Sequence, residues 1–419
     1  MKDKVIVHGA ALSIGSSCVE IAAGRDHLIL DYGKPLEGEG PVPFDISRKR
    51  FQRYQFFLSH SHLDHCGHVN EIPTAKWPIG EKIHVLATER TIRAMKLQDP
   101  KKEFRQIDKM YPDSYWGWHK FWYAYVYADH SAPDACSFII STKHNTILYT
   151  GDFRLHGRTS ADYVRRIKKV LAHRVFEGKP LTVITEATNA GKENGPSEED
   201  VENELATEFS MPGLVMVKMA NQNLQRLISV YNACKRTGRI LVTEPYTALC
   251  AAELGKQETG MDGQSAGTAM DIQPDGEHWK VFNIDSDRTE RMAADGTLYR
   301  YGGRKKISKE ELVENADRLV VIANYHAEDF LKKKGLIDRV VWSMWDGYPE
   351  YEKLCMEYYV KHIHSSGHVY EKDLVSFIRE LAPKRTILMH STDPKRIANL
   401  ISDFTEPVVL SDGQSVRLD

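Results

Sequence analysis

Three histidines and an aspartate stand within six residues of one another, as His60, His62, Asp64 and His65. They follow an apolar run at 54–58, which predicts a buried strand that carries them onto the loop at its end. Neutral imidazoles and a carboxylate are ligands that a borderline metal such as zinc prefers. His60 and His62 can point into one hollow, whereas the other two can turn toward a second point. One loop could therefore serve two neighbouring metal ions. The alternative is a surface loop that is rich in histidine by chance.

Further residues of these types stand at the ends of other predicted strands. Apolar runs at 146–150, 181–185 and 385–389 predict strands that lead into Asp152, Glu186 and His390. A loosely alternating run at 120–127 predicts another, which leads into His130. His368 closes the sequence His-Ser-Ser-Gly-His. Each strand would deliver its polar residue at its carboxyl end, so the chain offers matching ligands from several distant segments. This favours a metal site over a chance cluster.

The segments that carry these residues predict an α/β protein with an inserted region. We expect the insertion at 196–354, where the composition changes, with one domain formed by 1–195 and 355–419 on either side of it. From 213 to 242 the insertion alternates strand and helix patterns. The stretch 256–309 is rich in Gly, Asp, Gln and Lys and has little periodicity, which predicts an extended surface excursion.

Aromatic residues are dense between 115 and 127. We expect most of them to pack in the core, but the piece 115–118 could instead form a stacking platform for unpaired bases. The aromatics of 343–348 are expected to pack against the protein and not to contact a ligand.

Composition sets limits on the class of protein. The chain has 419 residues and a formal net charge of −2, so no global basic field attracts nucleic acid and polyanion binding must rest on local contacts. The six cysteines are scattered without a Cys-x-x-Cys pair, which favours reduced thiols. No leader-like segment or long apolar run is present in the sequence. We therefore expect a cytoplasmic protein with no membrane partner.

The pattern His-x-His-x-Asp-His at 60–65 resembles the hexapeptide of the metallo-β-lactamase superfamily. Glu186, which is followed by a small residue and a threonine, resembles motif A of the β-CASP branch of nucleases. The sequence at 364–368 resembles the His-x-Ser-Gly-His motif of that branch. The Thr-Asn-Ala at 188–190 is closest to the RNase J group. These motifs extend the resemblance over nearly the whole chain.

The resemblance implies an α/β fold in which an αββα metallo-β-lactamase sandwich carries an inserted α/β β-CASP domain. It also implies that Asp31, at the end of the strand 27–30, orients metal ligands. The ligand set it implies is His60, His62 and His130 on one zinc ion, Asp64, His65 and His390 on the other, and Asp152 bridging the two.

Such a pair of Zn²⁺ ions, for which Mn²⁺ is an alternative, would lower the pKa of a bridging water and clamp phosphate oxygens. We expect Asp64, Glu186 and His368 to act in catalysis. His368 would contact the scissile phosphate and protonate the leaving group, and Glu186 would hold its imidazole. His390 indicates RNA, because RNA-directed β-CASP enzymes carry histidine where DNA-directed relatives usually carry an apolar residue.

The resemblance thus predicts a binuclear metal-dependent phosphodiesterase that cleaves single-stranded RNA as an exonuclease, an endonuclease or both. A homodimer is compatible with it. Three alternatives stay open: a DNA-directed β-CASP nuclease, a non-catalytic RNA-processing scaffold, and a metallohydrolase that acts on a small ester or lactam. Intact candidate ligands at all seven positions disfavour the scaffold, and the β-CASP motifs disfavour the small-ester hydrolase.

Overall fold

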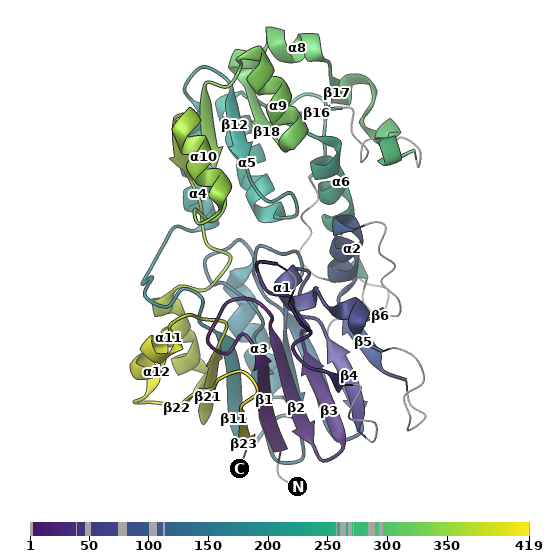
Figure 1. Ribbon diagram of the computed structural model, residues 1–419, viewed down its shortest axis with the longest axis vertical. Helices are drawn as coiled ribbons and strands as arrows, with labels where there is room; N and C mark the ends of the chain where they lie inside the picture. Colours follow the sequence, from purple (N-terminus) through teal and green to yellow (C-terminus); the bar gives the residue numbers. More distant parts are fainter. Residues whose placement is uncertain are drawn as a thin grey trace. The chain divides into compact units, whose positions relative to one another are not determined.

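The computed structural model describes residues 3–38, 40–46, 52–73, 82–99, 107–111, 114–256, 258–259, 265–266, 270, 272–283, 290–292 and 296–418. The chain divides into two compact units. The first consists of Met1–Gly195, Glu258–Thr268 and Gly367–Asp419, and the second of Pro196–Gln257 and Ala269–Ser366. Both ends of the chain belong to the first unit, where they lie close together (Figure 1).

The first unit is built on two seven-stranded sheets. One sheet has the order β23-β1-β2-β3-β4-β5-β6, antiparallel from β23 to β3 and parallel from β3 to β6. Its strands are β1 Asp3–Gly9, β2 Cys18–Ala23, β3 Asp26–Leu30, β4 Arg53–Phe57, β5 His84–Ala87, β6 Ile107–Lys109 and β23 Ser415–Leu418.

The other sheet has the order β22-β21-β11-β10-β9-β8-β7. It is parallel from β22 to β10 and antiparallel from β10 to β7. Its strands are β7 Trp116–Trp118, β8 Phe121–Tyr127, β9 Cys136–Ser141, β10 Thr146–Tyr149, β11 Leu181–Glu186, β21 Arg385–Met389 and β22 Glu406–Val409.

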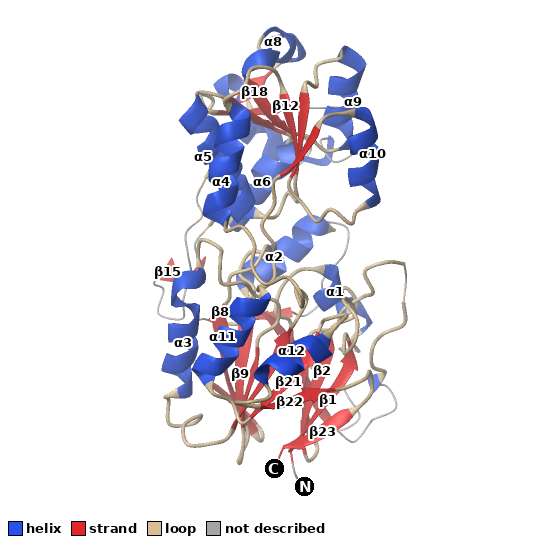
Figure 2. Cartoon of the chain, turned by 90° about the vertical axis from the view of Figure 1, so that its left-hand side faces the viewer, coloured by secondary structure: helices blue, strands red, loops and turns tan. Residues whose placement is uncertain are grey.

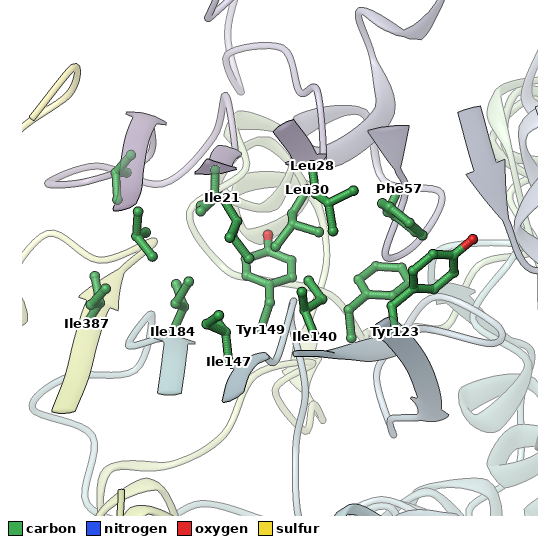
Figure 3. Close-up of a cluster of buried hydrophobic side chains, with 14 of the residues drawn as sticks. Ile21, Leu28, Leu30, Phe57, Tyr123, Ile140, Ile147, Tyr149, Ile184 and Ile387 are labelled. Atoms are coloured by element: carbon green, nitrogen blue, oxygen red, sulfur yellow. The ribbon is translucent and has the colours of Figure 1, made fainter. Parts of the chain in front are cut away.

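An apolar core lies between the two sheets. Figure 3 shows side chains from both sheets that point toward one another across this core, for example Leu30 and Phe57 from one and Tyr149 and Ile184 from the other. Because side chains alternate along a strand, the neighbouring Leu148 faces the opposite side of its sheet. This burial on both faces explains why strands such as β10 read as unbroken apolar runs in the sequence.

Helices cover the outer faces of both sheets. On the second sheet these are α3 Tyr163–Leu171, α11 Glu371–Leu381 and α12 Pro394–Ile401 (Figure 2). Apolar residues of α11 recur at Leu374, Phe377, Ile378 and Leu381, which is the spacing of one helix face. On the first sheet, Cys66 of α1 (Leu63–Cys66) and Met95 of α2 (Glu89–Gln98) pack on the outer face. The layers are therefore helix, sheet, sheet and helix, and the predicted αββα sandwich is confirmed.

The second unit is a parallel α/β structure. Its sheet has the order β17-β16-β13-β18-β12-β19-β20, and every neighbouring pair is parallel. The strands are β12 Val215–Lys218, β13 Ile240–Thr243, β16 Trp279–Phe282, β17 Lys306–Ile307, β18 Leu319–Ile322, β19 Arg339–Trp342 and β20 Val360–His362.

Helices lie on both faces of this sheet. On one side are α4 Glu198–Phe209, α5 Leu224–Thr237 and α6 Pro245–Leu254, and on the other are α9 Tyr325–Lys334 and α10 Pro349–Glu357 (Figure 2). α8 spans Lys309–Glu314. Ser197 is the N-cap of helix α4, and its side chain forms a capping box with that of Asp200.

The described part of the chain differs from the sequence expectation in two places. The strand β20 pairs with β19, so the chain up to Ser366 groups with the second unit, beyond the expected return at 355. Much of 256–309 lies outside the described residues, but β16 within it is a sheet strand. Trp279 in β16 is fully buried, and its Nε1 donates to Thr243 Oγ1 at 2.9 Å. This part of the stretch is core, and the expectation of a surface excursion is wrong for it.

One aromatic segment packs as expected, and the other does not. Trp116 lies in strand β7 and stacks on Tyr123 and Tyr125, so this piece packs against the core and does not form an open platform. In contrast, Trp345 and Tyr348 are about half exposed, at 54% and 50%, although the sequence favours packing there. No helix in the described ranges is long and apolar enough to cross a membrane.

Candidate metal centre

The predicted ligands come from both sheets of the first unit and meet beyond the carboxyl ends of the strands. β4 of one sheet leads into the loop and short helix that carry the His-x-His-x-Asp-His pattern. In the other sheet, β8 leads into His130, β10 into Asp152 and β21 into His390. β11 ends in Glu186 itself. Parallel strands deliver their ends to one edge, which is why segments so distant in sequence come together here.

The first group of candidate ligands consists of His60, His62 and His130. One nitrogen of each ring lies within 4.8 Å of the others, and His130 Nε2 is 3.2 Å from His62 Nδ1. Burial, together with the neighbouring histidines, holds the pKa of His60 and His130 well below the ordinary value. These rings are therefore neutral, which is the form that binds a metal ion.

The second group consists of Asp64, His65, Asp152 and His390. Asp152 Oδ2 lies 3.2 Å from His65 Nε2, and His390 Nε2 lies 3.3 Å from Asp64 Oδ2. Burial alone would raise the pKa of both carboxyl groups, but the histidines around them lower it well below the usual range. Both aspartates are therefore charged and favour a cation between them.

Asp152 also lies close to the first group. Its Oδ2 is 3.8 Å from His60 Nε2 and 3.9 Å from His130 Nε2. Both Asp152 Oδ2 and His60 Nε2 are buried and have no hydrogen-bond partner. Buried polar atoms are almost always paired, so these two require a partner that can accept their lone pairs. A divalent cation meets that requirement, and the residues present fit a metal site.

The ring nitrogens that face away from the centre are held by hydrogen bonds, as is usual for histidines that bind metal. The pairs are His60 Nδ1 with Ser59 Oγ at 3.0 Å, His65 Nδ1 with Asp31 Oδ2 at 2.7 Å, His130 Nδ1 with the Gly367 carbonyl at 2.6 Å, and His390 Nδ1 with Thr188 Oγ1 at 2.9 Å.

Asp31, for which the resemblance implies a ligand-orienting role, contacts the candidate ligand His65. Besides His65, its carboxylate accepts hydrogen bonds from the backbone and hydroxyl of Ser59 and from the hydroxyl of Tyr149 at 2.6 Å. Sequence analysis missed Ser59, Tyr149 and Thr188 as orienting residues. Ser59 stands next to His60 and could have been suspected, whereas Thr188 is 202 residues away from the histidine it contacts.

His368 and Glu186 lie beside these groups. Together with Asp152 and His390 they form a third set of side chains close enough to hold an ion. His368 Nδ1 donates to Glu186 Oε2 at 2.9 Å, and Glu186 Oε1 accepts from the Phe153 backbone N–H at 2.9 Å. Burial would lower the pKa of His368, but Glu186 and Asp152 outweigh it and raise the pKa to about 9. All nine candidate site residues of the sequence analysis thus lie together.

Comparisons with known proteins agree with this picture. No family model matches the chain. It is 28% identical over 171 residues to "Probable RNase MJ4" of Methanocaldococcus jannaschii, a match that covers 36% of this chain and 39% of that protein. It is 26% identical over 221 residues to "Ribonuclease J" of Sinorhizobium meliloti, which covers 49% of this chain and 37% of that protein. The matches thus cover less than two fifths of the length of either relative. They confirm the predicted resemblance to RNase J-like proteins.

A solved structure shares the architecture over the whole chain. This is a protein of unknown function from Enterococcus faecalis V583, with a TM-score of 0.74, 19% sequence identity and 100% coverage of both chains. It supports the fold, including the second unit.

Proposed function

We propose that the protein is a metal-dependent phosphodiesterase that cleaves single-stranded RNA. The observation that carries the proposal is that seven candidate ligands from four separated segments lie together. Two of their buried atoms, His60 Nε2 and Asp152 Oδ2, have no hydrogen-bond partner. The similarity to proteins named ribonuclease J supports the choice of substrate. We further propose that the second unit is the β-CASP insertion implied by the sequence motifs.

We assign two divalent cations to the centre, with Zn²⁺ as the first choice and Mn²⁺ as the alternative. His60, His62 and His130 would hold one ion, Asp64, His65 and His390 the other, and Asp152 would contact both. When bound, such ions polarise phosphate oxygens and lower the pKa of water, which supplies a nucleophile near neutral pH. The two aspartates would offset part of the positive charge, and the burial of the centre strengthens these interactions.

The remaining residues act on the proton and on the leaving group. His368 would contact the scissile phosphate and protonate the departing oxygen. Glu186 accepts from Nδ1 of this ring, so it fixes the ring orientation and stabilises the imidazolium form. Glu186 in turn accepts from the backbone N–H of Phe153, the residue directly after Asp152. This hydrogen bond fixes the position of Glu186, and through it that of His368, relative to Asp152.

Cleavage of end-labelled oligonucleotides tests the proposal. Purified protein should shorten single-stranded RNA in the presence of Zn²⁺ or Mn²⁺, and a chelator should stop the reaction. Labels at the 5′ and 3′ ends separate exonuclease from endonuclease products. A chromogenic ester serves as the competing substrate. Hydrolysis of the ester with no cleavage of any RNA or DNA would contradict the proposal.

A further inference from the structure

Asp129 and Arg154 form a buried ion pair beside the candidate ligands. Asp129 directly precedes His130, and Arg154 follows Asp152 by two residues. Arg154 Nε lies 2.7 Å from Asp129 Oδ1, and the Arg154 backbone N–H donates to the Asp129 carbonyl at 2.7 Å. Both residues are 0% exposed. The pair therefore joins two loops that each carry a candidate ligand, by side chain and by main chain.

The carboxylate of Asp129 is enclosed on its other side. Its Oδ2 accepts from the Thr159 backbone N–H and from the Thr159 hydroxyl, both at 2.6 Å. Gly157 packs against the pair so closely that an added Cβ would lie 2.2 Å from Asp129 Oδ1 and 2.6 Å from Arg154 Nε. Only a glycine leaves room for the pair, so the local chain is built around it.

The sheet itself does not join these two loops. His130 follows β8 and Asp152 follows β10, and β9 lies between these strands. Strand pairing fixes β8 to β9 and β9 to β10. Beyond the strand ends, the two loops are joined directly by the isolated antiparallel bridge between Asp129 and Arg154 and by the ion pair of their side chains. A rigid contact beyond the strand ends would keep the candidate ligands His130 and Asp152 at a fixed separation.

We propose that the Asp129–Arg154 pair positions His130 relative to Asp152 and so sets the shape of the metal centre. The inference rests on the proposed metal site. Neither residue belongs to a group of candidate ligands, and each stands within two residues of one, so both would act through those ligands. Groups that orient metal ligands without binding the metal typically change metal affinity or activity by about 10- to 100-fold when altered. We expect an effect at the lower end of that range, because Asp129 acts through the backbone and not through the imidazole.

The test compares Asp129→Asn with Asp26→Asn. In the control, Asp26 Oδ1 also meets an arginine Nε, that of Arg53, at 2.6 Å. That pair lies at the first residues of β3 and β4, which is the end of these strands away from the ligands. For wild type and both variants, we would measure Zn²⁺ affinity by competition with a chelator, the absorption spectrum of the Co²⁺-substituted protein, and the midpoint of thermal unfolding.

We expect both variants to unfold at lower temperature, but only Asp129→Asn to bind Zn²⁺ about 10-fold more weakly and to shift the Co²⁺ spectrum. An Asp129→Asn protein with the affinity and spectrum of wild type overturns the inference, as does an equal loss of affinity in Asp26→Asn. Failure of wild type to bind either Zn²⁺ or Mn²⁺ would instead overturn the proposed function. If Asp129→Asn does not fold, Thr159→Val removes one hydrogen bond to Asp129 and should weaken Zn²⁺ binding a few-fold; unchanged binding then counts against the inference.

Discussion

Asp152 lies within 4 Å of candidate ligands from both groups. Its Oδ2 faces His60, His65 and His130, and its Oδ1 lies 3.7 Å from His390 Nδ1. We predict that Asp152→Ala removes contacts to both ions, loses most of the second metal, and slows RNA cleavage by at least about 100-fold, or roughly 3 kcal/mol of transition-state stabilisation. Elemental analysis and cleavage rates check this. A variant that keeps its full metal content would show that Asp152 does not connect the two positions.

His368 has two chemical roles open to it, because the same ring belongs to a group that could hold an ion. Its hydrogen bond to Glu186 at 2.9 Å suits both roles, but His368 is not among the seven ligands that the resemblance implies, so we assign it the proton-transfer role. We predict that His368→Ala keeps its metal ions but cleaves about 10²- to 10⁴-fold more slowly, the range for a lost general acid. Measuring metal content beside rate separates the roles, and a variant that loses metal would reassign His368 as a ligand.

Three strands of the first sheet share one buried carboxylate. Glu20 of β2 accepts from His8 Nε2 of β1 at 2.6 Å and from His27 Nδ1 of β3 at 2.5 Å. Burial would raise the pKa of Glu20, but these histidines outweigh it and lower the pKa from 4.5 to about 2. Because the pKa is depressed in the folded state, the ionised form stabilises the sheet above pH 4.5, and this contribution is lost as the pH falls toward 2.

We therefore predict that Glu20→Gln lowers the free energy of unfolding by about 3 kcal/mol at pH 7. The difference between variant and wild type should shrink as the pH falls from 4.5 toward 2. Urea denaturation at several pH values measures it. A difference that stays constant down to the lowest pH at which both proteins fold would mean that packing, and not the charge of Glu20, is the cause.

The strands that lead into the site could be predicted because their sequences are unusual. The runs at 146–150, 181–185 and 385–389 match β10, β11 and β21 to within one residue at either end. A parallel strand that is buried on both faces has a short, continuous apolar sequence, and its short length and β-branched residues distinguish it from a buried helix. The strand β16 was missed because Lys280 interrupts its apolar run and because polar, glycine-rich sequence surrounds it.

Hydrogen bonds that orient the ligands were harder to predict. The contact between Thr188 and His390 depends on β11 and β21 being neighbours in the sheet, which neither residue's local sequence reveals. The Asp129–Arg154 pair likewise joins loops that become neighbours only after the sheet forms. Ligands can be found from residue type and spacing, whereas the residues that hold them depend on strand order.

At the scale of the whole chain, the candidate centre draws on residues from 60 to 390, so metal binding and folding of the first unit should be coupled. A ligand that binds the folded state alone raises its stability by mass action. We predict that excess Zn²⁺ raises the midpoint of thermal unfolding and that a chelator lowers it. Asp152→Ala is the matched control and should respond much less. An identical midpoint with and without metal would contradict a centre formed by folding.

The sugar of the substrate should affect the rate of cleavage. The 2′-hydroxyl is the one chemical group that separates RNA from DNA at a given nucleotide. If the protein binds this hydroxyl through a buried polar group, DNA leaves that group without a partner, at a cost of about 1–3 kcal/mol. That corresponds to cleavage of RNA faster than matched DNA by about 5- to 150-fold. Single-stranded oligonucleotides that carry one deoxynucleotide in RNA, or one ribonucleotide in DNA, should locate the position at which the hydroxyl matters. We expect the nucleotide beside the scissile phosphate to account for most of the preference. Equal or faster cleavage of DNA under the same metal would exclude the RNA assignment and leave the phosphodiesterase assignment in place.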